Sequence, residues 1–253
     1  MNVFVTGASS GIGAALAREY AARGARLGLV ARRQALLDEL VRALPGTHHA
    51  YCVDVTDRDA LIAAAQRFEA DTGGADVVIA NAGISAGVLT EYYEDLETFG
   101  EILQTNVASL AYTFHPFIAP MRKRGGGKLV GIASVAGIRG LPGSEAYCAS
   151  KAAAISYLES LRIELGRDGI RVVTIAPGFV RTPLTARNPY GMPFLMDADA
   201  FARAAVDAIA AGRSYAVIPW QMAILAKLLR AVPNWLYDRV MARRPYKPRK
   251  PRA

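Results

Sequence analysis

Few residues in this chain are of the types that build disulfide frameworks or metal sites. Its 253 residues include two cysteines, Cys52 and Cys148, and three histidines, His48, His49 and His115. The two cysteines match neither a disulfide framework nor the ligand spacing of a zinc site. The histidines are expected at the surface or at strand edges rather than as ligands. We therefore predict no metal site.

A secretory leader is also missing from the sequence. The first strand-like run begins at residue 2, and no apolar segment typical of a signal peptide precedes it. With no disulfide framework to indicate an oxidising compartment, this predicts a cytoplasmic protein.

The body of the chain lacks net charge, although the whole chain carries +8. Residues 220–253 contain nine Lys or Arg and one acid, which leaves 21 basic and 21 acidic side chains in residues 1–219. A neutral body argues against a groove built for a phosphate backbone, and the basic end has no aromatic residue beyond Tyr246. We predict no nucleic-acid partner, and we divide the chain into a body, 1–219, and an extension, 220–253.

Apolar runs and helix-forming segments alternate along the body. Short strands that are apolar throughout, alternating with helices, predict a parallel sheet covered on both faces. Right-handed crossovers then give an α/β, Rossmann-type doubly wound fold with its ligand at the carboxyl ends of the strands. The expected strands cover residues 2–6, 26–31, 48–53, 76–81, 127–133, 170–176 and 214–219, and the expected helices 11–23, 34–44, 57–72, 95–123, 147–167 and 199–211.

A glycine-rich turn joins the first strand to the first helix. Its sequence is Thr6-Gly7-Ala8-Ser9-Ser10-Gly11-Ile12-Gly13, and a run of helix formers follows. In this arrangement backbone N–H groups and a helix N-terminus meet a pyrophosphate, and glycine is needed where a side chain would block the approach. We expect the dinucleotide phosphates to lie against Gly7, Ser9, Ser10, Gly11, Ile12 and Gly13.

The end of the second strand indicates which dinucleotide binds. An acid is usual there in folds that bind the ribose 2′-hydroxyl of NAD. Here Ala31 is followed by Arg32 and Arg33. Cations in place of the acid favour the 2′-phosphate, so we predict NADP(H) rather than NAD(H), with Arg32 as its partner.

Tyr147 and Lys151 are spaced for acid–base work. Residues i and i+4 of a helix share one face, and an ammonium beside a phenol favours the phenolate and lowers the tyrosine pKa. This makes a proton donor and acceptor usable near neutral pH. Ser134 lies thirteen residues upstream. A Tyr and a Lys at this spacing can occur by chance. The dinucleotide turn that precedes them in the sequence favours their interpretation as an acid–base pair.

These motifs, in this order, resemble the short-chain dehydrogenase/reductase family in its compact single-domain branch, over about residues 2–219. Further segments match the family pattern: Asp54-Val55 after the third strand, Asn81-Ala82-Gly83 at the end of the fourth, Asn106 in the following helix, and Pro177-Gly178-Phe179-Val180-Arg181-Thr182 after the sixth. Nothing in the family's catalytic set is missing.

The resemblance implies roles for these residues. Tyr147 would exchange a proton with the substrate oxygen, Ser134 would orient that oxygen, Lys151 would hold the nicotinamide ribose, and Asn106 would anchor a relay water. Asp54, Val55, Asn81, Ala82, Gly83, Pro177, Gly178, Val180 and Thr182 would contact the cofactor together with the glycine turn, Tyr147 and Lys151. The resemblance also implies a homodimer or homotetramer.

The function expected on these grounds is NADP(H)-dependent interconversion of a carbonyl and a secondary alcohol. The alternative is a non-catalytic redox sensor or scaffold on the same fold. Such proteins typically lose the tyrosine or the lysine, and both are present here.

Residues 183–198 are expected to form a loop beside the active site. Three prolines and a glycine interrupt regular structure there. In similar proteins this stretch closes over the substrate, so Tyr190, Met192, Phe194, Leu195 and Met196 would give it an apolar lining and favour an apolar, lipid-like substrate. Packing of these side chains on the sheet edge is the alternative.

The extension is expected to form two short helices, over 220–232 and from Asn234 to Met241, before a basic, proline-rich and disordered end from Pro245. The first helix is too short to span a bilayer. Trp220, Trp235 and Tyr237 would suit an interfacial contact with anionic lipid. Packing on the body or on a partner subunit is the favoured alternative.

Overall fold

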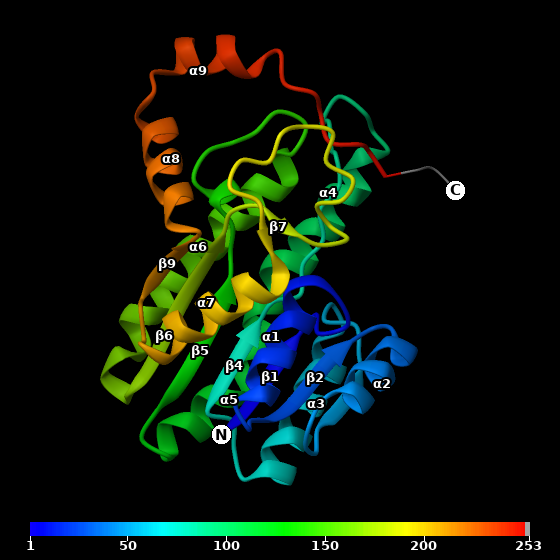
Figure 1. The fold of residues 1–253 in the computed structure, drawn as a ribbon, viewed down its shortest axis with the longest axis vertical. Helices are drawn as coiled ribbons and strands as arrows, with labels where there is room; N and C mark the ends of the chain where they lie inside the picture. The colour runs from blue at the N-terminus through cyan, green and yellow to red at the C-terminus, as the bar shows by residue number, and fades with distance from the viewer. Residues whose placement is uncertain (251–253) are drawn as a thin grey trace.

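The computed structural model describes residues 1–250 and contains a seven-stranded parallel sheet (Figure 1). The strands are β1 (Asn2–Thr6), β2 (Arg26–Ala31), β3 (His49–Cys52), β4 (Val77–Ala80), β5 (Gly127–Ile132), β6 (Ile170–Pro177) and β9 (Tyr215–Ile218). Their spatial order is β3-β2-β1-β4-β5-β6-β9. The order reverses between β1 and β4, where such sheets open a crevice at the carboxyl ends of their strands. The predicted fold class is confirmed.

Helices cover the sheet in two layers. The helices are α1 (Gly11–Ala22), α2 (Gln34–Ala43), α3 (Arg58–Thr72), α4 (Asp95–Leu103), α5 (Ser109–Lys123), α6 (Glu145–Leu165), α7 (Ala198–Ala210), α8 (Trp220–Ala231) and α9 (Asn234–Met241). One buried cluster joins the sheet to α1, α2 and α7, and a second joins it to α3, α5 and α6. Two apolar cores on opposite faces explain why the strands are apolar on both sides.

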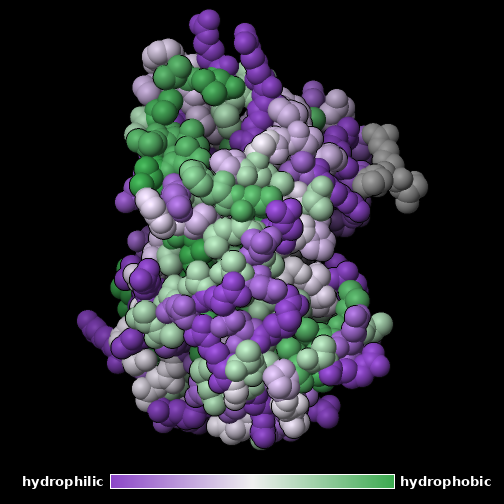
Figure 2. Space-filling model, viewed as in Figure 1, coloured by the Kyte–Doolittle hydropathy of each residue, from purple (hydrophilic) through white to green (hydrophobic). Residues whose placement is uncertain are grey.

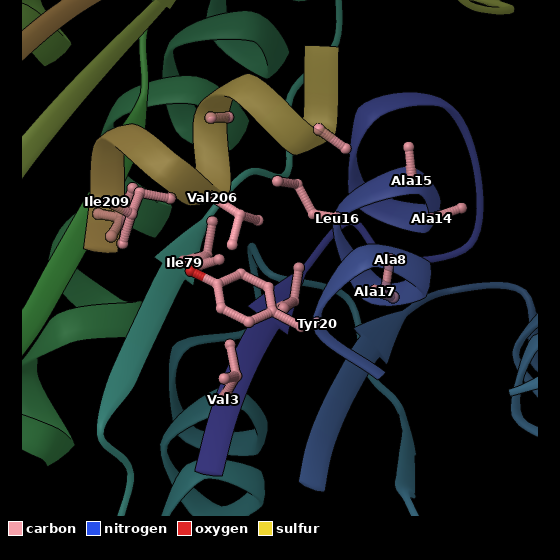
Figure 3. Close-up of a cluster of buried hydrophobic side chains, with 14 of the residues drawn as sticks. Val3, Ala8, Ala14, Ala15, Leu16, Ala17, Tyr20, Ile79, Val206 and Ile209 are labelled. Carbon is pink, nitrogen blue, oxygen red and sulfur yellow. The ribbon is translucent and has the colours of Figure 1, made fainter. Parts of the chain in front are cut away.

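Small side chains set the position of α1 on the sheet. Ala14 and Ala17 are buried beside Leu16 and Tyr20, and this part of α1 packs between β1 and α7 (Figure 3). Burial raises the pKa of the Tyr20 phenol well above its usual value. Alanines allow the helix to approach closely, and this holds its N-terminus at the end of β1, where a pyrophosphate would bind.

The helix expected over 95–123 is interrupted. A π-helical turn over Gln104–Ala108 separates α4 from α5, and Asn106 lies within it. Such turns insert one extra residue and are frequent at functional sites. Hydrophobic periodicity does not reveal this break, because both flanking helices keep their own apolar faces. A two-residue ladder that was not predicted, β7 (Val180–Arg181) with β8 (Met196–Asp197), ties the two ends of the following loop together.

The extension folds over the carboxyl ends of the strands rather than away from the body. After β9 the chain forms α8 and α9 and then runs back toward α4 (Figure 1). Hydrophobic side chains gather over α8 on the outer surface (Figure 2), where Trp220, Ile224 and Leu228 are 66%, 51% and 61% exposed. Their inward neighbours Met222 and Ala226 are buried. The extension thus has one face on the body and one apolar face outside.

Candidate active site

The glycine turn and the first turn of α1 form one end of a cleft of about 470 Å³. Gly7 and Gly11 have φ values of 67° and 55°, which favour glycine. Ser10, the N-cap residue of α1, makes no capping hydrogen bond with its side chain, and Gly11 and Ile12 of the first turn line the cleft. Backbone donors at a helix N-terminus fit the phosphates of a dinucleotide.

Gly13 acts differently from the rest of the turn. It does not line the cleft; a Cβ at this position would lie 2.2 Å from the Gly7 carbonyl oxygen and 2.6 Å from Asn81 Nδ2. Asn81 Nδ2 donates to the carbonyl oxygens of Thr6 and Gly7 at 3.0 and 3.3 Å. Gly13 therefore serves the close packing of α1 on β1, and Asn81 holds the turn against β4.

Two arginines lie at the end of the cleft beyond β2. Arg32 Nη1 contacts Asp54 Oδ2 at 3.4 Å, whereas Arg33 Nη2 donates to the hydroxyls of Ser9 and Ser10, both at 2.9 Å. Hydrogen bonds from Thr56 lower the pKa of Asp54 against the effect of burial, and Arg32 adds to this. Of the two guanidiniums, Arg33 is the one joined to the phosphate turn. Sequence reasoning singled out Arg32 alone.

Tyr147 lies in the first turn of α6, between two hollows of the surface. Tyr147 and Ser134 line the dinucleotide cleft and also a second cavity of about 370 Å³. Burial raises the pKa of the Tyr147 phenol to about 12, and a hydrogen bond with Ser134 acts in the opposite direction. A group bound in either hollow can therefore reach the same phenol.

The expected effect of Lys151 on that phenol is not what this structure shows. Lys151 Nζ lies 5.8 Å from the centre of the Tyr147 ring and donates to the Ile132 carbonyl oxygen at 2.8 Å. Burial lowers the pKa of Lys151 to about 8. Burial is thus the main influence on both pKa values: it disfavours the charged form of each group, raising the pKa of Tyr147 and lowering that of Lys151.

Asn106 braces the chain beside this lysine. Its Oδ1 accepts from the Ile84 N–H at 2.8 Å, and its Nδ2 donates to the Ile84 carbonyl oxygen and to Ser150 Oγ, both at 3.0 Å. A Cβ on Gly83 would lie 3.3 Å from Asn106 Oδ1 and 3.6 Å from Lys151 Nζ. Asn106 therefore joins the end of β4 to α6. Its role in a proton relay stays a prediction.

The other expected cofactor residues come together along the cleft. Ile12, Asp54, Val55, Asn81, Ala82, Gly83, Pro177, Gly178, Val180 and Thr182 all line it, together with Tyr147 and Lys151. Strands β1, β3, β4, β5 and β6 precede these residues and bring them to one edge of the sheet. The fit of a dinucleotide rests on this shape, on the free helix N-terminus and on glycines that permit close approach.

Of the expected substrate residues, Tyr190 lies on the second cavity and Met196 does not. Met192, Phe194 and Leu195 are not among the described residues that line it, and Phe194 is 51% exposed with a φ of 56°. Pairing of β8 with β7 draws this end of the loop toward α7, where Met196 packs against the core. Leu184, Thr185 and Asn188, earlier in the loop, line the cavity instead.

The extension supplies part of the cavity wall. Met222, Leu225, Ala226 and Leu229 of α8 and Tyr237 of α9 line it. Arg139 fastens the two helices: its guanidinium donates to the carbonyl oxygens of Leu229 and Val232, and it lies 3.7 Å from the centre of the Tyr237 ring. The amphipathic pattern of α8 revealed a buried face but not what that face would cover.

Comparisons with known proteins show which family this chain is similar to. Residues 1–191 match the model of the short chain dehydrogenase family. An uncharacterized oxidoreductase of Myxococcus xanthus is 40% identical over 238 residues, covering 92% of this chain and 93% of that protein. A short-chain dehydrogenase structure from Streptomyces avermitilis matches with a TM-score of 0.80 at 29% identity, covering 95% and 94% of the two chains. A 3-ketoacyl-ACP reductase structure from Sinorhizobium meliloti matches with a TM-score of 0.79 at 26% identity, covering 89% of this chain and 100% of that one.

The chain therefore belongs to the short-chain dehydrogenase family. Membership makes it an oxidoreductase that uses a nicotinamide dinucleotide and acts on a small molecule. Within residues 1–250, no cluster of His, Cys, Asp and Glu has the makings of a metal site. No helix of the described part is long and apolar enough to cross a membrane.

Proposed function

We propose that the protein reduces a carbonyl group on a largely apolar substrate to a secondary alcohol, with NADPH as the hydride donor. The observation that carries this proposal is the position of Tyr147 and Ser134 on the wall shared by the dinucleotide cleft and the second cavity. A carbonyl in the second cavity can accept hydrogen bonds from both hydroxyls while its carbon faces the cleft.

NADPH held along the cleft would supply the hydride that the carbonyl carbon accepts. Tyr147 donates its proton to the carbonyl oxygen, so the products are an alcohol and the oxidised cofactor. Ser134 holds that oxygen, and its hydrogen bond favours the phenolate left on Tyr147. Lys151 holds the nicotinamide ribose, and its positive charge favours the same phenolate when the two groups approach. Asn106 would keep the relay water through which Tyr147 regains a proton.

The preference for NADPH rests on the two arginines beyond β2. No acid takes the place that would receive a ribose 2′-hydroxyl, and Arg33 stands between the phosphate turn and the end of β2. A 2′-phosphate there gains two guanidiniums. Because cells keep the NADPH pool reduced, reduction is the direction we propose.

An apolar substrate is favoured by the walls of the second cavity. Leu141, Phe179, Leu184, Leu225 and Leu229 contribute to it. The 3-ketoacyl-ACP reductase among the similar structures is named for a keto substrate on an acyl chain. The competing function, a non-catalytic sensor, has the intact set of Tyr147, Ser134 and Lys151 against it.

The test is NADPH oxidation against methyl ketones of increasing chain length, repeated with NADH. We expect kcat/KM to rise with chain length, because each methylene buried in the cavity contributes about 0.8 kcal/mol. A profile independent of length contradicts the apolar substrate. Turnover of no carbonyl, with NADPH still bound, would support the sensor.

For the assembly we propose a homodimer or homotetramer in the cytoplasm. The exposed stripe of Trp220, Ile224 and Leu228 on α8 is one surface that a second copy would cover. Light scattering of the wild type and of Ile224→Glu tests this: a monomeric wild type contradicts an oligomer. Co-sedimentation with anionic vesicles would instead reveal contact between the extension and lipid.

A further inference from the structure

The last residues of the described chain form a strap across the mouth of the active site. We use C-terminal strap for residues 242–250. The Gly87 N–H donates to the Pro248 carbonyl oxygen at 2.9 Å, and the Arg249 guanidinium donates to both carboxylate oxygens of Asp95 at 2.8 and 2.9 Å. Lys250 pairs with Glu101 at 2.9 Å. The strap is therefore held at several points, contrary to the disorder that composition predicts from Pro245 onwards; residues 251–253 of that prediction lie outside the described residues.

These anchors place the ammonium of Lys247 beside the catalytic tyrosine. Lys247 Nζ donates to Ser85 Oγ at 2.8 Å and lies 5.9 Å from the centre of the Tyr147 ring. Lys151 Nζ lies 5.8 Å from the same centre. The two lysines differ in what they face: Lys151 lines the dinucleotide cleft, whereas Lys247 lines the second cavity.

The charges around the second cavity are all positive. Its described lining includes Arg139, Arg244 and Lys247 and no Asp or Glu. The Arg139 guanidinium already donates hydrogen bonds to the carbonyl oxygens of Leu229 and Val232, at the end of α8. Arg244 lies 4.2 Å from the centre of the Tyr190 ring, and within residues 1–250 neither it nor Lys247 forms a salt bridge. Burial lowers the pKa of Lys247. A half-buried cation without a counter-charge gains most from an anionic ligand.

We propose that the substrate carries an anionic group close to its reacting carbonyl, bound by Lys247 of the C-terminal strap with Arg244 beside it. The apolar remainder of the substrate lies against α8, so the substrate is an amphiphilic oxo acid. This inference rests on the proposed carbonyl reduction and adds a substrate class to it. Lys247 acts as a specificity-determining residue, and Arg249 and Gly87 act as positioning residues that hold the strap.

The test compares 2-oxo and 3-oxo acids with their methyl esters of equal chain length. The wild type is expected to have a kcat/KM for the acid higher than for the ester by on the order of 10- to 100-fold, the range typical of a hydrogen bond to a charged group. Lys247→Met should bring that ratio close to one, chiefly by raising KM for the acid. Lys247→Arg should keep most of the ratio.

Two further variants serve as controls. One removes a lysine charge away from the cavity, and the other displaces the strap without removing a charge. Lys227→Met removes an exposed lysine from α8 outside the cavity, and the acid-to-ester ratio should not change. Gly87→Ala removes no charge, but its Cβ would lie 2.1 Å from the Lys247 carbonyl oxygen and displaces the strap. It should lower the ratio as Lys247→Met does.

The outcomes distinguish this inference from the proposed function. A wild type that prefers the ester, or a Lys247→Met variant that loses acid and ester turnover equally, overturns the anionic subsite and leaves carbonyl reduction in place. If no carbonyl is reduced, carbonyl reduction fails, and calorimetric titration with decanoate and decanol still tests the subsite. Weaker binding of decanoate alone in Lys247→Met supports it, and equal binding in both proteins overturns it.

Discussion

Replacing Arg33 with alanine is expected to weaken the preference for NADPH over NADH. The guanidinium lies 2.9 Å from the hydroxyls of both Ser9 and Ser10, at the junction of the phosphate turn and the end of β2. In a complex with NADPH it can turn to the 2′-phosphate without a change in the backbone. NADH lacks that phosphate, so its binding should be nearly unchanged.

The size of the effect follows from the exposure of Arg33. A hydrogen bond to a charged group contributes about 1.5–3 kcal/mol, and solvent reduces this at an exposed side chain. We expect a loss of about 1–2 kcal/mol, which corresponds to about 5- to 30-fold in kcat/KM for NADPH. The loss should be smaller in 0.5 M salt, because exposed charge pairs are screened.

The assay is the kcat/KM of each cofactor at saturating ketone, with Arg42→Ala as the control. Arg42 is an exposed arginine on α2, the helix whose N-cap residue is Arg33, and contacts the Asp38 carbonyl oxygen. Arg42→Ala should leave kcat/KM unchanged for both NADPH and NADH. Equal losses for NADPH and NADH in Arg33→Ala would refute the reasoning, because they would show that Arg33 only holds the serine turn. Arg32→Ala should have the smaller effect, since Asp54 already pairs with Arg32.

Three further predictions concern stability. Burial lowers the pKa of Lys151 to about 8 from 10.5, so the unfolded state binds more protons between those values and stability rises with pH across this window. Lys151→Met should remove that slope and stabilise the cofactor-free protein at pH 7 by about 1–3 kcal/mol in urea unfolding; a slope that survives contradicts the assignment. Arg139→Ala should free α8 and α9 from the body, so trypsin should cleave the extension at least about tenfold faster, in line with more than 1.4 kcal/mol lost from charged hydrogen bonds. An unchanged cleavage rate would show that the apolar face of α8 suffices. Gly13→Ala should cost about 1–3 kcal/mol by overpacking against the Gly7 carbonyl oxygen, and an unchanged melting temperature would contradict that contact.

Local sequence patterns predicted the fold of residues 1–219 because several of them indicate the same doubly wound parallel sheet. The strands are short and apolar, the first is followed at once by glycines and a helix, and parallel strands must then bring their carboxyl ends together. That placement makes neighbours of Gly7, Asn81, Ser134 and Tyr147, which lie far apart in the sequence. The main elements appear within about two residues of their expected bounds.

The sequence was less informative wherever contacts between distant segments decide the structure. The π-helical turn at Asn106 depends on hydrogen bonds to Ile84 and Ser150. The fall in the pKa of Lys151 depends on burial that a residue spacing does not reveal. The strap is basic and proline-rich, which predicts disorder, yet Asp95 and Gly87 hold it in place. Its carboxylate partner is one residue of a helix more than a hundred positions away.

For a similar reason, the sequence did not reveal which segments line the second cavity, and the predicted substrate residues stay a prediction. An apolar loop next to an active site favours contact with substrate, but pairing of Met196 with Val180 turns the end of that loop toward α7. The extension takes its place on the cavity. The helix pattern of residues 220–231 predicts a buried face, and only the fold shows that Ser134 and Tyr147 lie across from it.

We propose that Tyr147 exchanges the proton in a carbonyl reduction that uses NADPH. The most direct measurement is single-turnover NADPH oxidation by the wild type and by Tyr147→Phe, with NADPH affinity measured in parallel by fluorescence. The phenylalanine keeps the ring and removes only the hydroxyl, so we predict a loss of about 100- to 10,000-fold in rate with unchanged NADPH affinity. Turnover retained within about threefold, with the cofactor still bound, would contradict the account.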